Sequence, residues 1–205
     1  MSGDTFNSLS ALPPERRWRA QTAPVPVAVA LIRQAAAAGE ELLLIRRANG
    51  PYTGQWALVG GKWDFGETLA EAIVREVMEE TGLRTAFVAL RALVSERVAP
   101  WTADDLGAHF LLLVCDLVVR EGTAAEQQEG RVDWFSRETI DALYAEGHII
   151  PSDYAMIREF GGATRHSPYV EVEMRALLDG TAAQPSQMLR FLRHEAPGES
   201  EIERG

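Results

Sequence analysis

The sequence predicts an α/β (α+β) protein in which helices cover a mixed β-sheet. Short runs of alternating apolar residues, typical of strands, recur along the chain, and segments with a helical period lie between them. Glycine and proline residues that favour turns separate most of these segments. Helices interspersed with strands, some of them in adjacent pairs, favour a sandwich. The 205 residues, of which 46% are hydrophobic, suffice for one such domain with tails.

Three strands are predicted before the first helix. Apolar residues alternate with small ones over residues 25–33, and an alanine-rich connection leads to a second strand over residues 41–45. Residues 48–54 are rich in turn formers and predict a loop. A short third strand is predicted over residues 56–59 and ends at two glycines.

The first helix is predicted over residues 67–81 and stops at Gly82. Ser136 stands where a cap of a later helix is expected. In chain order, the remaining strands are predicted over residues 87–94, 109–119, 131–135 and 169–174, and the remaining helices over residues 136–146 and 153–160. Residues 186–194 are only weakly amphipathic.

The composition excludes several classes of protein. Thirty acidic against 20 basic residues give a net charge of -10, which argues against nucleic-acid or anionic-membrane binding. No apolar run approaches the roughly 20 residues that cross a bilayer, and the first 12 residues resemble no secretory signal. A single cysteine, Cys115, cannot form an intramolecular disulfide. These features predict a cytoplasmic protein without a membrane partner.

The chain divides into three predicted regions. Residues 1–23 lack sustained periodicity and form an N-terminal extension, residues 24–160 form the domain, and residues 161–205 form a C-terminal extension. The C-terminal extension contains no basic recognition helix of the kind that reads DNA.

Three glutamates crowd one side of the first predicted helix. At about 100° per residue, Glu76 falls at the edge of the apolar face, Glu80 within it and Glu79 about 60° outside it. Carboxylates at these spacings repel one another, and more strongly when they are partly desolvated. A solvated acidic face is the alternative interpretation, but it would not place Glu80 among core positions. A compensating positive charge is therefore expected.

A divalent cation that prefers oxygen ligands is the natural compensator. Carboxylate oxygens suit Mg²⁺ or Mn²⁺. The four histidines are scattered without ligand spacing, and a zinc cluster of His and Cys is absent from the sequence. The sequence therefore predicts Mg²⁺ (or Mn²⁺) as cofactor.

The same stretch resembles the Nudix box, G-x5-E-x7-R-E-U-x-E-E-x-G-U, in which U is an apolar residue. Every specified position matches: Gly61, Glu67, Arg75, Glu76, Val77, Glu79, Glu80, Gly82 and Leu83. The similarity extends over about residues 25–160 and implies the α/β/α sandwich of MutT-like Nudix hydrolases. One departure is Val59, which stands where many members have proline.

The resemblance implies roles for residues of the box. Glu76, Glu79 and Glu80 would bind the metal, with Gly61 beside them. Arg75 would orient one of these carboxylates. Glu67 would support the site from the first helical turn.

A further acidic residue is implied in the loop before the strand over residues 131–135. Glu126 and Glu129 both lie there, and Glu129 is the preferred candidate. Either Glu80 or Glu129 would take the proton from the attacking water. The predicted catalytic residues are Glu80, Glu76, Arg75 and Glu129.

Substrate contacts are predicted from residues near the box. Arg46, Arg47 and Lys62 could touch phosphate oxygens. Trp63, Tyr52 and Trp101 could stack on a base, whereas Trp56 and Trp134 are assigned to the core.

The implied function is Mg²⁺-dependent hydrolysis of a phosphoanhydride bond in a nucleoside diphosphate linked to another moiety, such as a nucleoside triphosphate or a nucleotide-sugar. The alternative is a nucleotide-binding sensor or regulator with little turnover. The complete set of helix carboxylates favours the enzyme. The implied partner is a small nucleotide, and a homodimer stays open.

Overall fold

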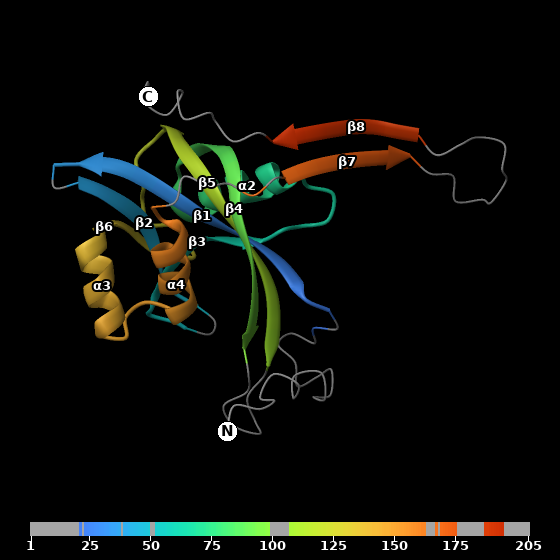
Figure 1. Ribbon diagram of the computed structural model, residues 1–205. Coiled ribbons are helices and arrows are strands. Elements are labelled where there is room, and N and C mark those ends of the chain that lie inside the picture. Colours follow the sequence, from blue (N-terminus) through green and yellow to red (C-terminus); the bar gives the residue numbers. More distant parts are fainter. Residues whose placement is uncertain are drawn as a thin grey trace.

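The computed structural model describes residues 21, 23–37, 39–49, 52–98, 107–162, 167, 169–175 and 187–194. The predicted sandwich with a mixed sheet is confirmed (Figure 1). Six strands lie in the order β4-β5-β1-β3-β2-β6, and β1 runs parallel to β5 but antiparallel to β3. Their bounds are β1 Val25–Ala36, β2 Gly39–Arg47, β3 Trp56–Lys62, β4 Arg84–Val98, β5 Ala108–Glu121 and β6 Gly130–Ser136.

Helices cover both faces of this sheet. Helix α2 (Leu69–Thr81) packs on one face, and α3 (Arg137–Ala145) and α4 (Pro151–Phe160) pack on the other. Strand β1 contributes side chains to the hydrophobic cores on both faces of the sheet, because successive side chains point to opposite faces. Ala28, Ala30 and Ile32 lie under α2, whereas Val29 and Leu31 lie under α3 and α4. The predicted core positions of Trp56 and Trp134 are confirmed, since Trp56 is buried and Trp134 packs against the core under α2.

A separate hairpin follows α4. Strands β7 (Tyr169–Arg175) and β8 (Gln187–His194) pair antiparallel and lie near α2, away from α3 and α4 (Figure 1). The weakly amphipathic segment at residues 186–194 is thus largely a strand. Much of the two predicted extensions lies outside the described residues, so their limits stay predictions.

Two helices begin elsewhere than predicted. Helix α2 starts at Leu69 rather than at residue 67, because Thr68 caps it: the Thr68 side chain accepts a hydrogen bond from the Glu71 backbone, and the Glu71 carboxylate accepts one in return. The expectation that Glu67 acts from the first helical turn is therefore wrong, since it precedes the cap. Helix α4 starts at Pro151, which suits the first turn because proline has no N–H to satisfy.

Strands β1 and β2 form an antiparallel hairpin. Strands β1 and β2 extend into the predicted alanine-rich connection, where Ala36 pairs with Gly39. Within the described residues, no helix has the length and apolar character needed to cross a membrane.

Candidate active site

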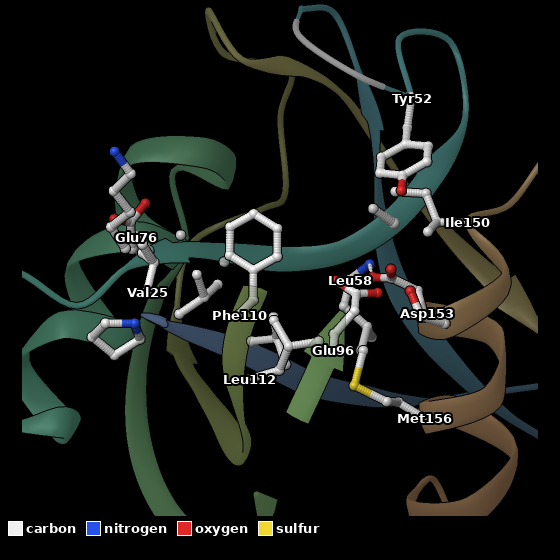
Figure 2. Close-up of a pocket in the computed structure, with 18 of the residues that line it drawn as sticks. Val25, Tyr52, Leu58, Glu76, Glu96, Phe110, Leu112, Ile150, Asp153 and Met156 are labelled. Carbon is white, nitrogen blue, oxygen red and sulfur yellow. Dashed lines mark hydrogen bonds between the residues drawn. The ribbon is translucent and has the colours of Figure 1, made fainter. Parts of the chain in front are cut away.

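A cavity of about 760 Å³ is lined by residues of strands β1, β3 and β5 and of helices α2 and α4 (Figure 2). Glu76 lies at one end, and Tyr52, Asp153 and Met156 lie at the other. Phe110 lies between the two ends, and Val29, Leu58 and Leu112 add apolar surface. The cavity thus has an acidic end and a partly apolar end.

The α2 glutamates lie as the helical phase predicts. Glu76 and Glu80 are buried, with 9% and 4% of their surface exposed, whereas the Glu79 side chain is 56% exposed. Glu76 and Glu80 both line the cavity. The helix therefore directs two carboxylates into the protein and one toward solvent.

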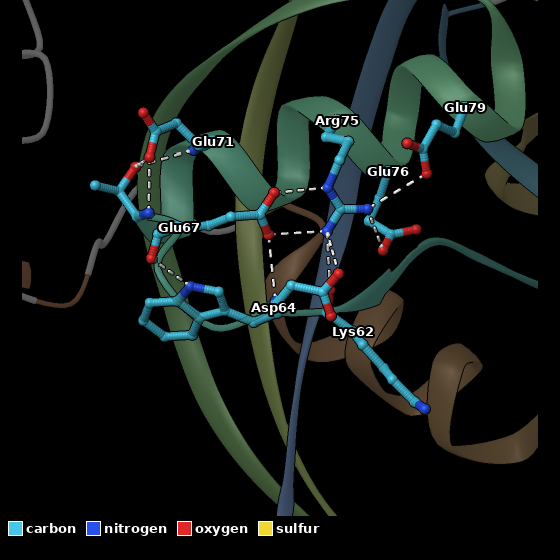
Figure 3. A network of polar contacts seen from close by, with 9 residues as sticks. Lys62, Asp64, Glu67, Glu71, Arg75, Glu76 and Glu79 are labelled. Atoms are coloured by element: carbon cyan, nitrogen blue, oxygen red, sulfur yellow. Dashed lines mark hydrogen bonds and ion pairs between the residues drawn. The ribbon is translucent and has the colours of Figure 1, made fainter.

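Arg75 joins the carboxylates around it (Figure 3). Its Nε and one Nη donate to the two oxygens of Glu67 at 2.7 and 2.9 Å. The other Nη donates to Glu76 at 2.8 Å and to Glu79 at 3.3 Å. The pKa of Arg75 is raised, chiefly by its hydrogen bonds to Glu67. Arg75 is thus placed to orient Glu76 and Glu79 with a permanent positive charge.

Glu80 is held by a backbone group of strand β3. The Gly60 backbone N–H donates to its Oε2 at 2.8 Å. The pKa of Glu80 is raised to about 9, chiefly by burial and also by Glu129 and Glu76, while the Gly60 hydrogen bond lowers it. Gly60 has φ 148°, and a side chain there would collide with the backbone of Ala28. Only glycine can therefore bring this N–H to the carboxylate.

The residues at the acidic end suit a hard divalent cation. Their donors are carboxylate oxygens, and a side chain at Gly61 would overlap the Glu76 carboxylate, so the glycine leaves that carboxylate room. Burial raises the pKa of Glu76 against the lowering effect of Arg75, because desolvation disfavours the charged carboxylate. In the described part of the chain, no three acidic, His or Cys side chains converge into a ready-made ligand set. Glu76 and Glu79 instead turn toward Arg75.

Glu129 joins this end from the turn before β6. It lines the cavity, and its side chain lies within hydrogen-bonding contact of Glu80. Its backbone carbonyl accepts a hydrogen bond from Ala48 at 3.1 Å, which fixes the turn against the end of β2. Glu126 does not line the cavity. Of the two loop candidates, the fold places Glu129 beside the helix glutamates.

The predicted substrate contacts divide into two groups. Arg47, Lys62 and Tyr52 line the cavity. Arg46 and Trp63 do not: Arg46 donates to the Gly54 carbonyl at 2.9 Å, and Trp63 donates to the Glu67 carbonyl at 2.9 Å while it packs against the core under α2. Trp101 lies outside the described residues.

Asp153, at the far end of the cavity, is not among the site residues predicted from the sequence. This buried residue of α4 accepts a hydrogen bond from the Leu58 N–H at 2.7 Å. Its pKa is raised to about 7, chiefly by burial and also by Glu96, while the Leu58 N–H and Arg47 lower it. A signal was available, because Asp153, Met156 and Ile157 share the buried face of α4 at helical spacing.

Tyr52 faces Asp153 from an unusual backbone conformation. Its φ of 65° lies in the left-handed region, which a non-glycine residue seldom adopts. Hydrogen bonds from Gly54 to Arg47 and from Gln55 to Tyr52, at 2.8 and 3.0 Å, hold the turn. Burial raises the pKa of the Tyr52 phenol, and Glu96 and Asp153 raise it further. Such local strain is often found at ligand sites.

Known proteins resemble part of this chain. An ADP-ribose pyrophosphatase of Methanocaldococcus jannaschii is 32% identical over 114 residues, which cover 56% of this chain and 65% of that protein. Nucleoside triphosphatase NudI of an Enterobacter species is 31% identical over 109 residues, which cover 49% of this chain and 77% of that protein. The chain thus spans just under two thirds of the first relative.

A solved structure and a family model agree with these relatives. The MutT protein from Methanosarcina mazei Go1 superposes with a TM-score of 0.52 at 26% identity, covering 69% of this chain and 96% of that one. The family model described as NUDIX domain matches residues 24–160. This match confirms the resemblance to the Nudix family that the sequence motif indicates. Because the match covers well over half of the residues of the chain, the chain belongs to the NUDIX domain family.

Proposed function

We propose that the protein hydrolyses a phosphoanhydride bond in a nucleoside diphosphate derivative with the help of Mg²⁺ or Mn²⁺. The observation that carries the proposal is the group of carboxylates, Glu76, Glu80 and Glu129, at one end of a cavity large enough for a nucleotide. A polyphosphate would be repelled by these groups unless cations lay between them. The activities named for the two relatives support this substrate class.

Glu76, Glu79 and Glu80 would hold the cation, next to the Gly61 backbone. When bound, Mg²⁺ or Mn²⁺ would neutralise phosphoryl oxygens and make a bound water more acidic. Arg75 keeps Glu76 and Glu79 oriented through its Nη. A cation bound at the acidic end would favour the charged form of the carboxylates there, so either Glu80 or Glu129 could accept the proton of the attacking water.

The two ends of the cavity give the substrate a direction. We place the phosphates at the acidic end, where the Lys62 carbonyl accepts a hydrogen bond from Arg75, and the nucleobase at the end with Tyr52 and Asp153. Phe110 and Leu112 provide apolar contact for a sugar or ring between them. Asp153 and Glu96 present carboxyl oxygens, which favour a base edge that offers N–H donors.

Binding without turnover is the competing function. All the acidic residues of the box are present, and the structure directs Glu76 and Glu80 into the cavity. Both features support catalysis over sensing alone. A cytoplasmic location and a homodimer stay predictions from the sequence.

A substrate panel tests the proposal. Nucleoside di- and triphosphates, ADP-ribose and nucleotide-sugars are incubated with the full chain and Mg²⁺ or Mn²⁺, and the released phosphate, pyrophosphate and monophosphates are identified. We expect metal-dependent cleavage of at least one class, abolished by chelation. Tight nucleotide binding without cleavage of any compound would support the sensor instead.

A further inference from the structure

The β7–β8 hairpin, which lies outside the matched residues 24–160, contacts the start of the glutamate-bearing helix. The Glu171 Oε1 accepts a hydrogen bond from the Leu69 backbone N–H at 3.0 Å. Leu69 is the first residue of α2 and is wholly buried. The two residues are 102 positions apart in the chain. A contact of such range ties the hairpin to the catalytic helix.

The Glu171 carboxylate suits the place that it occupies. The first N–H groups of a helix have no partner within the helix and carry a partial positive charge. In α2 the Thr68 hydroxyl satisfies the Glu71 N–H, and Glu171 satisfies the Leu69 N–H with a negative charge. Glu171 therefore adds to the cap of α2 from a distant part of the chain.

Glu171 is itself held in position by Tyr169. The Tyr169 hydroxyl donates to the same Oε1 at 2.8 Å. The Tyr169 ring packs edge to face with Phe87 of β4, at 6.4 Å between centroids and 61° between planes. Tyr169 also packs against the core under α2. The carboxylate is thus anchored to the sheet as well as to the helix.

A short path connects Leu69 to the carboxylates of the acidic end. Glu67 precedes Leu69 by two residues, and its carboxylate takes two hydrogen bonds from Arg75. Arg75 in turn donates to Glu76 and Glu79. A shift at Leu69 would therefore move Glu67 and loosen the guanidinium that orients two of the glutamates.

We propose that Glu171 is a positioning residue for the metal-binding glutamates, acting through Leu69, Glu67 and Arg75. The C-terminal hairpin is then part of the working site rather than an appended segment. The inference rests on the proposed function for the role of Glu76 and Glu79 as metal ligands. It is independent of which nucleotide is cleaved.

The test compares Glu171→Ala and Glu171→Gln in the full chain. Alanine removes the acceptor, whereas glutamine keeps an oxygen that can accept from Leu69. We expect Glu171→Ala to raise the Mn²⁺ dissociation constant and the half-saturating metal concentration roughly 3- to 10-fold, less than the loss of a direct partner of a metal ligand. At saturating metal, kcat should stay within about 2-fold, since the ligands themselves remain. Glu171→Gln should recover most of the affinity.

Val172→Thr provides the matched control. Val172 follows Glu171 on the opposite side of the strand and is 51% exposed, so it tests the hairpin without touching the cap. Tyr169→Phe is a milder second variant, because it removes only the hydroxyl that holds Glu171. It keeps the test available if Glu171→Ala fails to fold.

Three measurements separate the outcomes. Mn²⁺ affinity is measured without nucleotide, and the Leu69 amide exchange rate and the Arg75 Nε–H shift are followed by NMR. Faster Leu69 exchange, a moved Arg75 signal and weaker Mn²⁺ binding support the inference. A lower thermal midpoint with unchanged Arg75 signal and Mn²⁺ affinity would overturn it, leaving Glu171 a structural cap. Failure of the parent to bind Mn²⁺ or cleave any nucleotide would overturn the proposed function, and an unmoved Arg75 signal would then still contradict the coupling.

Discussion

Arg75 binds Glu67 through two parallel hydrogen bonds, from its Nε and one Nη to the two carboxylate oxygens. This paired geometry fixes the plane of the guanidinium, so its other Nη points at Glu76 and Glu79. The pKa of Glu67 is lowered, chiefly by the Arg75 hydrogen bonds, so the pair stays charged near neutral pH. The two residues act as one support for the acidic end of the cavity.

Glu67→Gln should therefore weaken metal-dependent activity without unfolding the protein. An amide offers one oxygen where the carboxylate offers two, so the guanidinium loses its fixed plane. We expect a loss of roughly 10-fold or more in metal affinity or kcat, measured by initial rates over a metal titration. Glu138→Gln, on the exposed first turn of α3, serves as control. Parental rates for Glu67→Gln would show that the pair does not support the site.

Gly61→Ala should reduce activity through a steric clash. The added Cβ would overlap the Glu76 carboxylate and force it away from the cavity. The backbone at Gly61 does not require glycine, since its φ lies outside the left-handed region. We expect at least a 10-fold loss in kcat/KM with folding preserved, as judged by circular dichroism. Gly162→Ala, where the nearest atom to a new Cβ is 3.9 Å away, should keep parental activity.

Asp153→Asn should make stability less dependent on pH. The folded-state pKa of Asp153 is raised to about 7 from an ordinary value of 3.8, so the folded protein holds this proton more tightly than the unfolded chain. Its contribution is fully present below pH 3.8 and is lost as pH rises through about 7. Asparagine can still accept from Leu58 but never carries the charge.

At pH 8 we therefore expect Asp153→Asn to be more stable than the parent by roughly 1–3 kcal/mol, with the difference shrinking toward pH 4. Denaturant unfolding at several pH values measures this difference. A difference that is independent of pH would mean that Asp153 does not carry the raised pKa. The hydrolysis rates of different nucleotides give a second result. The carboxyl of Asp153 lies at the end of the cavity where we place the nucleobase, so its loss should change the preference among nucleotides.

Tyr52→Asn separates backbone strain from binding. Asparagine tolerates the left-handed conformation better than tyrosine, so the thermal midpoint should not fall. The ring and phenol are lost from the cavity, so KM for the nucleotide should rise several-fold while kcat changes little. Steady-state kinetics on the best substrate measures both constants. A large fall in kcat at unchanged KM would contradict the placement of the nucleobase beside Tyr52.

The α2 site was predictable because its signal lies within one helix. Glu76, Glu79 and Glu80 differ in burial as helical phase dictates, and no distant residue is needed to see it. Helical phase also predicts that Asp153 is buried, because it shares one face of α4 with Met156 and Ile157. Its role, however, depends on Leu58 and Glu96 from separate strands, and the sequence does not show that these strands meet α4.

The substrate contacts were less predictable for a different reason. Arg46 and Arg47 are neighbours on a strand, where alternate side chains point to opposite faces, so only the register of β2 decides that Arg47 lines the cavity. Trp63 follows the end of β3 and packs into the core under α2. The start of α2 differs from the prediction because the Thr68–Glu71 capping box makes Leu69, and not Glu67, the first residue of the helix.

The most direct test of the account is the Glu80→Gln variant, assayed beside the parent for Mn²⁺ binding and nucleotide hydrolysis. Glutamine keeps the side-chain length and can accept from the Gly60 N–H, so the fold and thermal midpoint should be preserved. We predict that hydrolysis falls by at least about 100-fold, because the variant loses a carboxylate that is a proposed metal ligand and one of the two candidate proton acceptors. Hydrolysis at the parental rate, in a folded Glu80→Gln protein, would contradict the assignment of the site.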